Sequence, residues 1–411
     1  IVKMVPATMM TRVLGATCML AMLVLLVTRA VPSGKRVQSS MRIQTRTFSQ
    51  QPLKKVQLCA PRNSVLPQPQ KSSRSQPLRA AIFGDGGAWQ RQNPDEYPEQ
   101  VENPLDKLPD PQRDSVEVAG NTWSYLRTAN GDKSKGTIVF THGILSAGYS
   151  FKDTLKLLEK EGYDAIAVDW LGCGESSKPD KNSFDFSPEA YVQGLKGFLP
   201  AVGVDKPVFL VTQGYYLGQI GVLFAAENKD MVEKLVILNT PLGKSSKLPD
   251  PLGSYTGLLK GFAFGKKVDA GMYHAGGGPY AFNYTDYRIL QAPYKERDEA
   301  RLSFEAMMEN MDFNALVQRV SSAYTSFRKP ALIAWGTDDR YLDLNTVIEW
   351  TQDKPTATKL FALPATIGHF PQFDFPQQIV ETITRFVEGK DWTAPSDVQG
   401  KGPEGGGGPD L

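Results

Sequence analysis

Short apolar segments recur along the middle of the chain, and the spacing between most of them is long enough for a helix. Six segments have the length and composition of buried strands: 137–141, 164–168, 208–211, 235–238, 331–335 and 359–363. Helical patterns lie at 150–160, 188–199, 219–228, 344–351 and 376–388. This alternation predicts a mostly parallel sheet with helices on both faces. Alternating residues over 114–127, around Gly120-Asn121, predict a β-hairpin before it.

The segment 243–328 interrupts this alternation. It is rich in Gly and Tyr, has a helical pattern near 296–325 and shows no strand pattern, so it predicts a helical lid inserted into the core. The predicted divisions are a linker rich in Pro, Gly and acids at 85–113, a core in two parts at 114–242 and 329–390, and a Gly-rich disordered tail at 391–411.

The first 84 residues form a basic leader, with 13 Lys/Arg and no Asp or Glu. An apolar run at 13–27 is shorter than the roughly 20 residues of a membrane span, and it predicts a secretory signal peptide at 4–30. The acid-free, Ser-containing stretch 31–84 is typical of a transit peptide. Together they predict a plastid protein without a membrane span in its mature form. A plain secretory signal, a mitochondrial presequence and a short anchor are the alternatives.

The charge and composition of the remaining residues exclude several classes of partner and site. Residues 85–411 contain 33 Lys/Arg and 44 Asp/Glu, a formal charge of −11, which disfavours a nucleic-acid partner. This part of the sequence has one cysteine, Cys173, and the whole chain has three His. We therefore expect no disulfide framework, no metal site and no cofactor.

Five short motifs follow predicted strands in a fixed order. They are Thr-His-Gly at 141–143, Asp-x-x-Gly-x-Gly-x-Ser at 169–176, Leu-Val-Ile-Leu-Asn-Thr-Pro at 235–241, Trp-Gly-Thr-Asp-Asp-Arg at 335–340 and Gly-His-Phe at 368–370. Each motif alone is weak, but all five in this order and with these separations are specific.

In these motifs the chain resembles the α/β-hydrolase superfamily, and within it the branch of haloalkane dehalogenases and epoxide hydrolases. It is also similar to plastid α/β-hydrolase-like proteins of plants and algae. The resemblance covers roughly 114–390. It implies an α/β fold of the α/β-hydrolase type, with an eight-stranded mostly parallel sheet, a helical lid after the sixth strand, and a triad of nucleophile, acid and histidine.

The resemblance assigns two members of that triad. The family's histidine follows the last strand, and His369 matches it. The family's acid follows the seventh strand in a Gly-x-x-Asp pattern, which indicates Asp339, with Asp338 as the alternative. An imidazole can transfer a proton near neutral pH, and the carboxylate orients it. The other acid position of this branch holds Asn239, which cannot serve as a carboxylate.

The nucleophile position departs from the family pattern, which has Ser, Asp or Cys between small residues. Here the chain reads Leu-Val-Thr-Gln-Gly-Tyr-Tyr-Leu-Gly over 210–218. Counting along the strand indicates Gly214, counting back from the helix indicates Tyr215, and the Gly-x-x-x-Gly frame indicates Tyr216. Glycine has no attacking group, and tyrosine, with a pKa of about 10, holds little phenolate at pH 7. We therefore expect no covalent intermediate.

The resemblance also implies an oxyanion region at His142, Gly143 and Ile144. The backbone N–H of Ile144 would be one donor, the residue after the nucleophile would supply the second, and His142 would pack behind them. Of the remaining candidates, His274 in the lid is expected to be solvated or loosely packed. Cys173 is expected to be a small packing residue in its loop.

Tyrosines supply the last candidates. The lid contains Tyr255, Tyr273, Tyr280, Tyr284, Tyr287 and Tyr294. Epoxide hydrolases use lid tyrosines to polarise the ring oxygen, so both a ligand role and ordinary packing are open for this set. Tyr215 and Tyr216 either donate hydrogen bonds to a ligand or fill the space left by the altered elbow. Dehalogenation is disfavoured, because Tyr215 stands where that activity requires a Trp for the halide.

Two functions follow. The first is a hydrolase-like enzyme acting on a small or lipid-like apolar molecule, with His369 and Asp339 as a general-base dyad. The alternative is a catalytically inactive fold that binds a ligand or acts as an accessory protein in the plastid, where a protein partner is possible. Retention of both dyad residues favours the first, and the missing nucleophile with its bulky tyrosine pair favours the second.

Overall fold

The computed structural model describes residues 104–250, 252–257, 260–280, 284–363 and 366–390. The predicted leader, most of the predicted linker and the predicted tail lie outside these residues. Among the described helices, none has the length and apolar character needed to cross a membrane.

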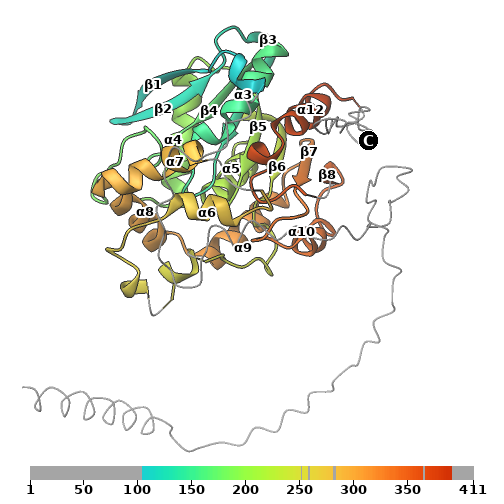
Figure 1. Cartoon of the computed structure of the whole chain (residues 1–411). Coiled ribbons are helices and arrows are strands. Elements are labelled where there is room, and N and C mark those ends of the chain that lie inside the picture. Colours follow the sequence, from blue (N-terminus) through green and yellow to red (C-terminus); the bar gives the residue numbers. More distant parts are fainter. Residues whose placement is uncertain (1–103, 251, 258–259, 281–283, 364–365, 391–411) are drawn as a thin grey trace, which may run out of the picture. The chain divides into compact units, whose positions relative to one another are not determined.

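An eight-stranded sheet lies at the centre of this part of the chain (Figure 1). The strands are β1 (Gln112–Val118), β2 (Asn121–Arg127), β3 (Asp132–Thr141), β4 (Tyr163–Val168), β5 (Val208–Gln213), β6 (Val232–Leu238), β7 (Ala331–Trp335) and β8 (Thr358–Ala362). Their order is β1-β2-β4-β3-β5-β6-β7-β8. β2 pairs antiparallel with both β1 and β4, and the remaining pairs are parallel. The predicted hairpin and all six predicted strands are confirmed.

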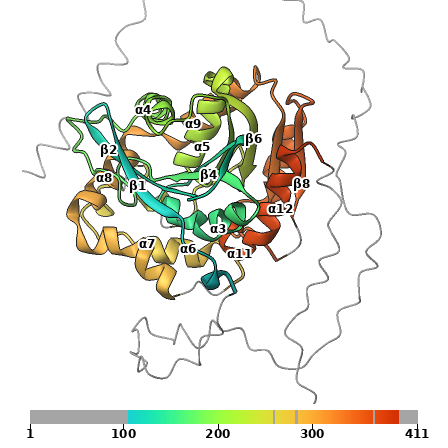
Figure 2. The ribbon, with the colours of Figure 1, turned by 90° about the horizontal axis from the view of Figure 1, so that it is seen from above.

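Helices cover both faces of the sheet, as its fully buried central strands β4 and β5 require (Figure 2). The core helices are α3 (Lys152–Lys160), α4 (Pro188–Ala201), α5 (Leu217–Glu227), α10 (Leu344–Thr351), α11 (Pro371–Asp374) and α12 (Pro376–Val387), with short 3₁₀ turns η2 (Pro104–Lys107), η3 (Gly148–Phe151) and η4 (Lys229–Met231). α3 and α12 bury apolar side chains against one face, and α4, α5 and α10 against the other. The five predicted helices are confirmed.

The segment between β6 and β7 contains η5 (Leu252–Tyr255), η6 (Lys260–Phe262), α6 (Ala270–Gly276), α7 (Tyr284–Glu296), α8 (Asp298–Asn310) and α9 (Phe313–Tyr324). α8 and α9 correspond to the predicted helical pattern. α6 and α7 were not predicted, because Gly271, Gly276 and Pro293 obscure their periodicity. α9 packs on α5, so the lid joins the same core as the helix behind the elbow.

The carboxyl ends of the parallel strands meet at one edge of the sheet. The loops after β3, β5, β6, β7 and β8 carry His142, the 214–216 elbow, Asn239, Asp339 and His369. Because these loops meet at one edge, residues up to 227 positions apart in the sequence converge there. Open α/β sheets bind their ligands at this edge.

Candidate functional site

A buried dyad lies between the loops that follow β7 and β8. The Nδ1 atom of His369 is 2.8 Å from Oδ2 of Asp339, and both side chains are fully buried. The other oxygen of Asp339 accepts hydrogen bonds from the backbone N–H groups of Tyr341 at 2.7 Å and Leu342 at 2.9 Å. The exposed Asp338 lies on the same loop. The geometry therefore pairs His369 with Asp339 and not with the alternative, Asp338.

Asn239 joins this dyad through its side-chain amide. Its Nδ2 donates to Asp339 Oδ2 at 2.8 Å and to the carbonyl oxygen of Gly336 at 3.1 Å, and its Oδ1 accepts from the N–H of Gly336 at 2.8 Å. Asn239 has a φ of 35°, a conformation that asparagine tolerates better than most residues. The sequence excluded Asn239 as a carboxylate but did not reveal that it supports Asp339.

The second ring nitrogen of His369 is free to act. Its Nε2 atom is buried and has no hydrogen-bond partner among the described residues. The rings of Tyr215, Tyr341 and Phe370 lie 5.4, 5.3 and 4.7 Å from the imidazole, centroid to centroid. The backbone is held as well, because the carbonyl oxygen of His369 accepts from Gln213 Nε2 at 2.8 Å. The imidazole is thus fixed in orientation, with an unbonded nitrogen in an aromatic environment.

The elbow after β5 contains two residues with positive φ. Gly214 has a φ of 89°, and Tyr216 has a φ of 55° and a ψ of −79° immediately before α5 begins. The N–H of Tyr216 donates to Oε1 of Gln219, which caps the helix. A Cβ at Gly218 would lie 2.3 Å from the carbonyl oxygen of Gln213, so this position requires glycine. Of the three predicted positions, Tyr216 is the one at the sharp strand-to-helix turn.

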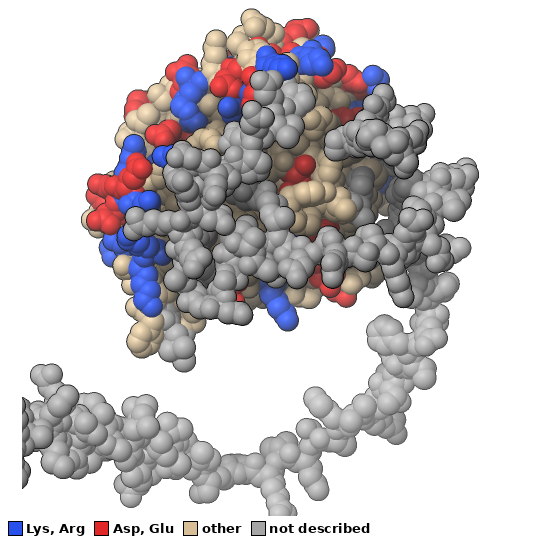
Figure 3. All heavy atoms as spheres, in the orientation of Figure 1, with Lys and Arg blue, Asp and Glu red and all other residues tan. Residues whose placement is uncertain are grey.

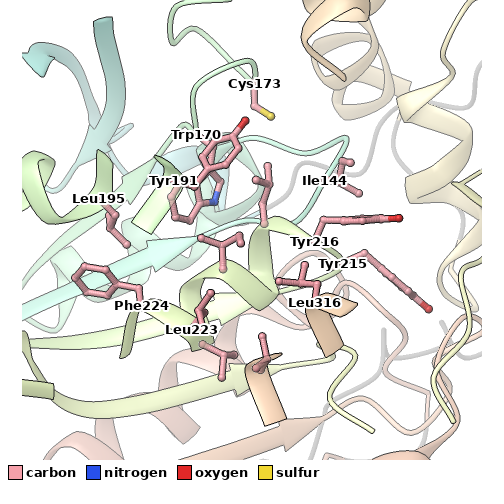
Figure 4. Packing of buried hydrophobic residues seen from close by; sticks show 14 of the residues in the cluster. Ile144, Trp170, Cys173, Tyr191, Leu195, Tyr215, Tyr216, Leu223, Phe224 and Leu316 are labelled. Atoms are coloured by element: carbon pink, nitrogen blue, oxygen red, sulfur yellow. The ribbon is translucent and has the colours of Figure 1, made fainter. Parts of the chain in front are cut away.

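The two elbow tyrosines are both buried but differ in their contacts (Figure 4). The hydroxyl of Tyr215 donates to the carbonyl oxygens of Lys247 at 2.8 Å and Tyr341 at 3.2 Å. The hydroxyl of Tyr216 has no partner among the described residues. Burial, assisted by the Asp339 charge at Tyr215 and the Asp312 charge at Tyr216, raises the pKa of both phenols. Neither hydroxyl therefore supplies phenolate at neutral pH.

The backbone N–H of Ile144, which we expected to be an oxyanion donor, is already hydrogen-bonded. The N–H of Ile144 donates to the carbonyl oxygen of Tyr215 at 2.9 Å, so it already has a partner in this structure. Gly143 lies against the elbow, where an added Cβ would be 2.9 Å from Cα of Gly214. His142 Nε2 accepts from the N–H of Trp170 at 3.2 Å, and burial lowers the pKa of His142 to about 4. This neutral, packed imidazole fits a structural position.

His274 is buried, contrary to the expectation of a solvated or loosely packed side chain. Its ring stacks on Phe370 at 4.1 Å, its Nε2 lies 3.1 Å from the carbonyl oxygen of Leu145, and burial lowers its pKa to about 3. α6, which the sequence did not reveal, carries His274 inward.

Cys173 is buried, and desolvation raises the pKa of its thiol to about 12. This inert thiol agrees with a packing role in its loop.

The six lid tyrosines do not converge on the dyad. Tyr273 comes near His369, with ring centroids 6.3 Å apart, and its buried hydroxyl has no partner among the described residues. Tyr280 and Tyr284 are exposed, Tyr287 donates to Asp269, and Tyr255 and Tyr294 pack against Phe304. Two cavities are described. One, of about 30 Å³, lies between α7 and the core. The other, of about 370 Å³, is lined by residues of α7 alone, and neither is lined by His369 or Asp339.

The described residues contain no group of three or more His, Cys, Asp or Glu side chains that could hold a metal ion.

The sequence profile of the alpha/beta hydrolase family matches residues 138–382, which is more than half of the chain. The chain belongs to the alpha/beta hydrolase family. This membership agrees with the fold and with the order of the motifs at the sheet edge.

Curated relatives of this hydrolase-family chain include enzymes. A cis-3-alkyl-4-alkyloxetan-2-one decarboxylase of Shewanella oneidensis is 26% identical over 307 residues, which cover 69% of this chain and 90% of the relative. Epoxide hydrolase 3 of Xenopus tropicalis is 22% identical over 280 residues, which cover 63% of this chain and 73% of the relative. The crystal structure of a haloalkane dehalogenase loop variant from Bradyrhizobium elkanii covers 68% of this chain and 96% of its own, with 17% identity and a TM-score of 0.55. At this identity the structural likeness shows the fold alone.

Proposed function

We propose that this protein is an enzyme that acts on a small or lipid-like apolar molecule, with His369 as a general base and no covalent intermediate. The observation that carries the proposal is the buried dyad, in which Asp339 holds Nδ1 of His369 at 2.8 Å while Nε2 is left without a partner. General bases act through an oriented nitrogen within reach of the proton to be removed. The decarboxylase and epoxide hydrolase relatives are named for small-molecule reactions, which supports this substrate class.

The proposed step follows from the two ring nitrogens. Nε2 of His369 takes a proton from water or from the substrate, and the attacking oxygen or the carbon that loses the proton keeps the electron pair. The imidazolium that forms donates from Nδ1 to the Asp339 carboxylate, which offsets its positive charge. The retained electron pair forms a new bond to the reacting carbon as the bond between this carbon and the leaving group breaks. The proton then passes from Nε2 to a leaving oxygen, or to solvent where the leaving group is a halide. Tyr216 takes no covalent part, because burial raises the pKa of its phenol.

A hydrolysis screen of the full chain against p-nitrophenyl esters, epoxides and haloalkanes tests this proposal. Turnover that falls by about 10² to 10⁴ in His369→Ala would support it. The control is Asn130→Ala, which removes an exposed hydrogen bond to Glu159 and touches no residue of the site, and both variants are first shown to unfold cooperatively. A serine-directed fluorophosphonate probe should leave the elbow unlabelled. Stoichiometric labelling there would contradict the absence of a covalent nucleophile.

One observation favours a second candidate, a catalytically inactive fold that binds a ligand or serves as an accessory protein. The Tyr215 ring packs 5.4 Å from His369 and its hydroxyl is bonded to two carbonyl oxygens, so this side chain acts as a fixed plug beside the dyad. Turnover on none of the three substrate classes by a folded protein would favour this candidate. A protein partner would then be sought by crosslinking.

We also propose a plastid location, supported by the order of an apolar run and an acid-free basic stretch in the leader. Fusion of residues 1–103 to a fluorescent protein, expressed in cells that contain plastids, would test it. Fluorescence in the secretory pathway or in mitochondria would replace this assignment with one of its alternatives.

A further inference from the structure

The first part of the lid is basic, although the surrounding chain is acidic. Residues 243–250, 252–257 and 260–268, together called the basic segment below, contain five Lys and one Asp. Four of these lysines have described side chains, and all four are exposed: Lys244, Lys247, Lys266 and Lys267. None of the four forms an ion pair within the part of the chain that the structure describes. Their positive charge is therefore available to an outside partner.

The same segment exposes a phenylalanine. The Phe262 side chain is 72% exposed, and it is the only large apolar residue of the segment with this degree of exposure among those described. Lys266 and Lys267 follow it within five positions. An aromatic ring next to several lysines combines the two features that draw protein segments to an anionic lipid surface.

The exposure of Phe262 is imposed by the anchoring of its neighbours. Ala263 is buried, and the N–H of Gly265 donates to Oε1 of Glu305 at 2.7 Å. The ring of Phe264 packs 5.8 Å from the ring of Tyr255, which is itself buried. The chain is thus tied down directly after Phe262, and the ring cannot reach the core without breaking these contacts.

We propose that the basic segment docks this protein onto an anionic lipid bilayer, with Phe262 in the interface and the lysines against the headgroups. A single exposed aromatic ring can insert into a bilayer interface. A stable protein–protein interface needs a larger cluster of apolar side chains at its centre. In Figure 3, Lys and Arg spheres lie at the lower left, next to a group of Asp and Glu spheres, over the region where Figure 1 draws the start of the lid and α8. This proposal does not depend on whether the dyad is catalytic.

One residue of the basic segment, Lys247, contacts the elbow. The carbonyl oxygen of Lys247 accepts the Tyr215 hydroxyl at 2.8 Å, so the basic segment is bonded to the residue that packs beside His369. The basic segment is therefore joined to the strand-to-helix turn at Lys247.

Vesicle co-sedimentation with the full chain tests the charge requirement. The vesicles are phosphatidylcholine, with or without about one third phosphatidylglycerol, at low salt. We expect Lys266→Gln/Lys267→Gln to lower partitioning onto the anionic vesicles by about 25-fold, since one lysine contributes about fivefold. The matched control is Lys133→Gln/Lys160→Gln, which removes the same charge from exposed positions on β3 and α3. The basic leader is identical in both variants, so its contribution cancels.

Insertion of the ring is tested separately with lipids brominated in their acyl chains. Phe262→Trp should be quenched on anionic vesicles beyond the parent protein, while Phe375→Trp, at a 37% exposed position directly before α12, should not be. Equal binding of the two double variants would overturn the proposal. So would binding without quenching at position 262, equal binding to neutral vesicles, or no vesicle binding at all.

Discussion

Asn239 and His369 share one oxygen atom of Asp339. The amide of Asn239 donates to Oδ2 of Asp339 at 2.8 Å, and Nδ1 of His369 lies 2.8 Å from the same atom. Asn239 occupies the alternative acid position after the sixth strand, so this structure keeps one carboxylate at the site and turns the other position into a hydrogen-bond donor. The carboxylate of Asp339 is thereby held in one orientation against Nδ1 of the imidazole.

Replacement of Asn239 by alanine should destabilise the fold. The variant leaves the buried N–H and carbonyl of Gly336 and one oxygen of Asp339 with fewer partners. We expect a loss of about 2–4 kcal/mol in the free energy of unfolding, measured by urea denaturation. The control is Asn130→Ala, which removes an exposed hydrogen bond to Glu159 and should change stability by less than about 0.5 kcal/mol. Equal effects of the two substitutions would show that Asn239 does not support the dyad.

The carboxyl group of Asp374 should make the free energy of unfolding depend on pH. Burial, with a smaller contribution from the nearby charges of Asp338 and Asp339, raises the pKa of its carboxyl from 3.8 to about 6. Between these two values the unfolded chain has lost the proton that the folded chain keeps, so stability from this group falls as pH rises from about 4 to about 6. Asp374→Asn removes the effect, while its side-chain oxygen can still accept from the N–H of Gly368.

The measurement is urea denaturation of both proteins at pH 4 and pH 6.5. The variant should gain about 1–3 kcal/mol relative to the parent over this interval, since groups common to both cancel in the difference. A constant difference across the interval would show that Asp374 titrates normally in the folded protein.

The strands, His369 and Asp339 could be predicted because each rests on local pattern. Six apolar runs of strand length fix the sheet, and the two dyad residues follow strands in recognisable motifs. The residue at the sharp turn of the elbow could not be predicted. Gly214, Tyr215 and Tyr216 are distinguished by their backbone conformation, and the amino-acid sequence does not give the φ angles. Nor could the pairing of the Ile144 N–H with the Tyr215 carbonyl, which depends on how two loops meet.

Gly218 should be intolerant of even the smallest side chain. A Cβ there would meet the carbonyl oxygen of Gln213 at 2.3 Å, a contact that only movement of β5 or α5 can relieve. We expect Gly218→Ala to lower the free energy of unfolding by about 3 kcal/mol or more. Gly261→Ala is the matched control, since nothing lies within 4 Å of its added Cβ, and it should be nearly neutral. A neutral Gly218→Ala would show that the turn relaxes at little cost.

The two elbow tyrosines should respond differently to loss of their hydroxyl groups. Tyr215→Phe removes hydrogen bonds to the carbonyl oxygens of Lys247 and Tyr341, and should cost about 1–2 kcal/mol of unfolding free energy. Tyr216→Phe removes a buried hydroxyl that has no partner among the described residues, and should be neutral or stabilising. Urea denaturation of both variants checks the order. The reverse order would mean that the Tyr216 hydroxyl has an interior partner and that Tyr215 is not the fixed plug beside His369.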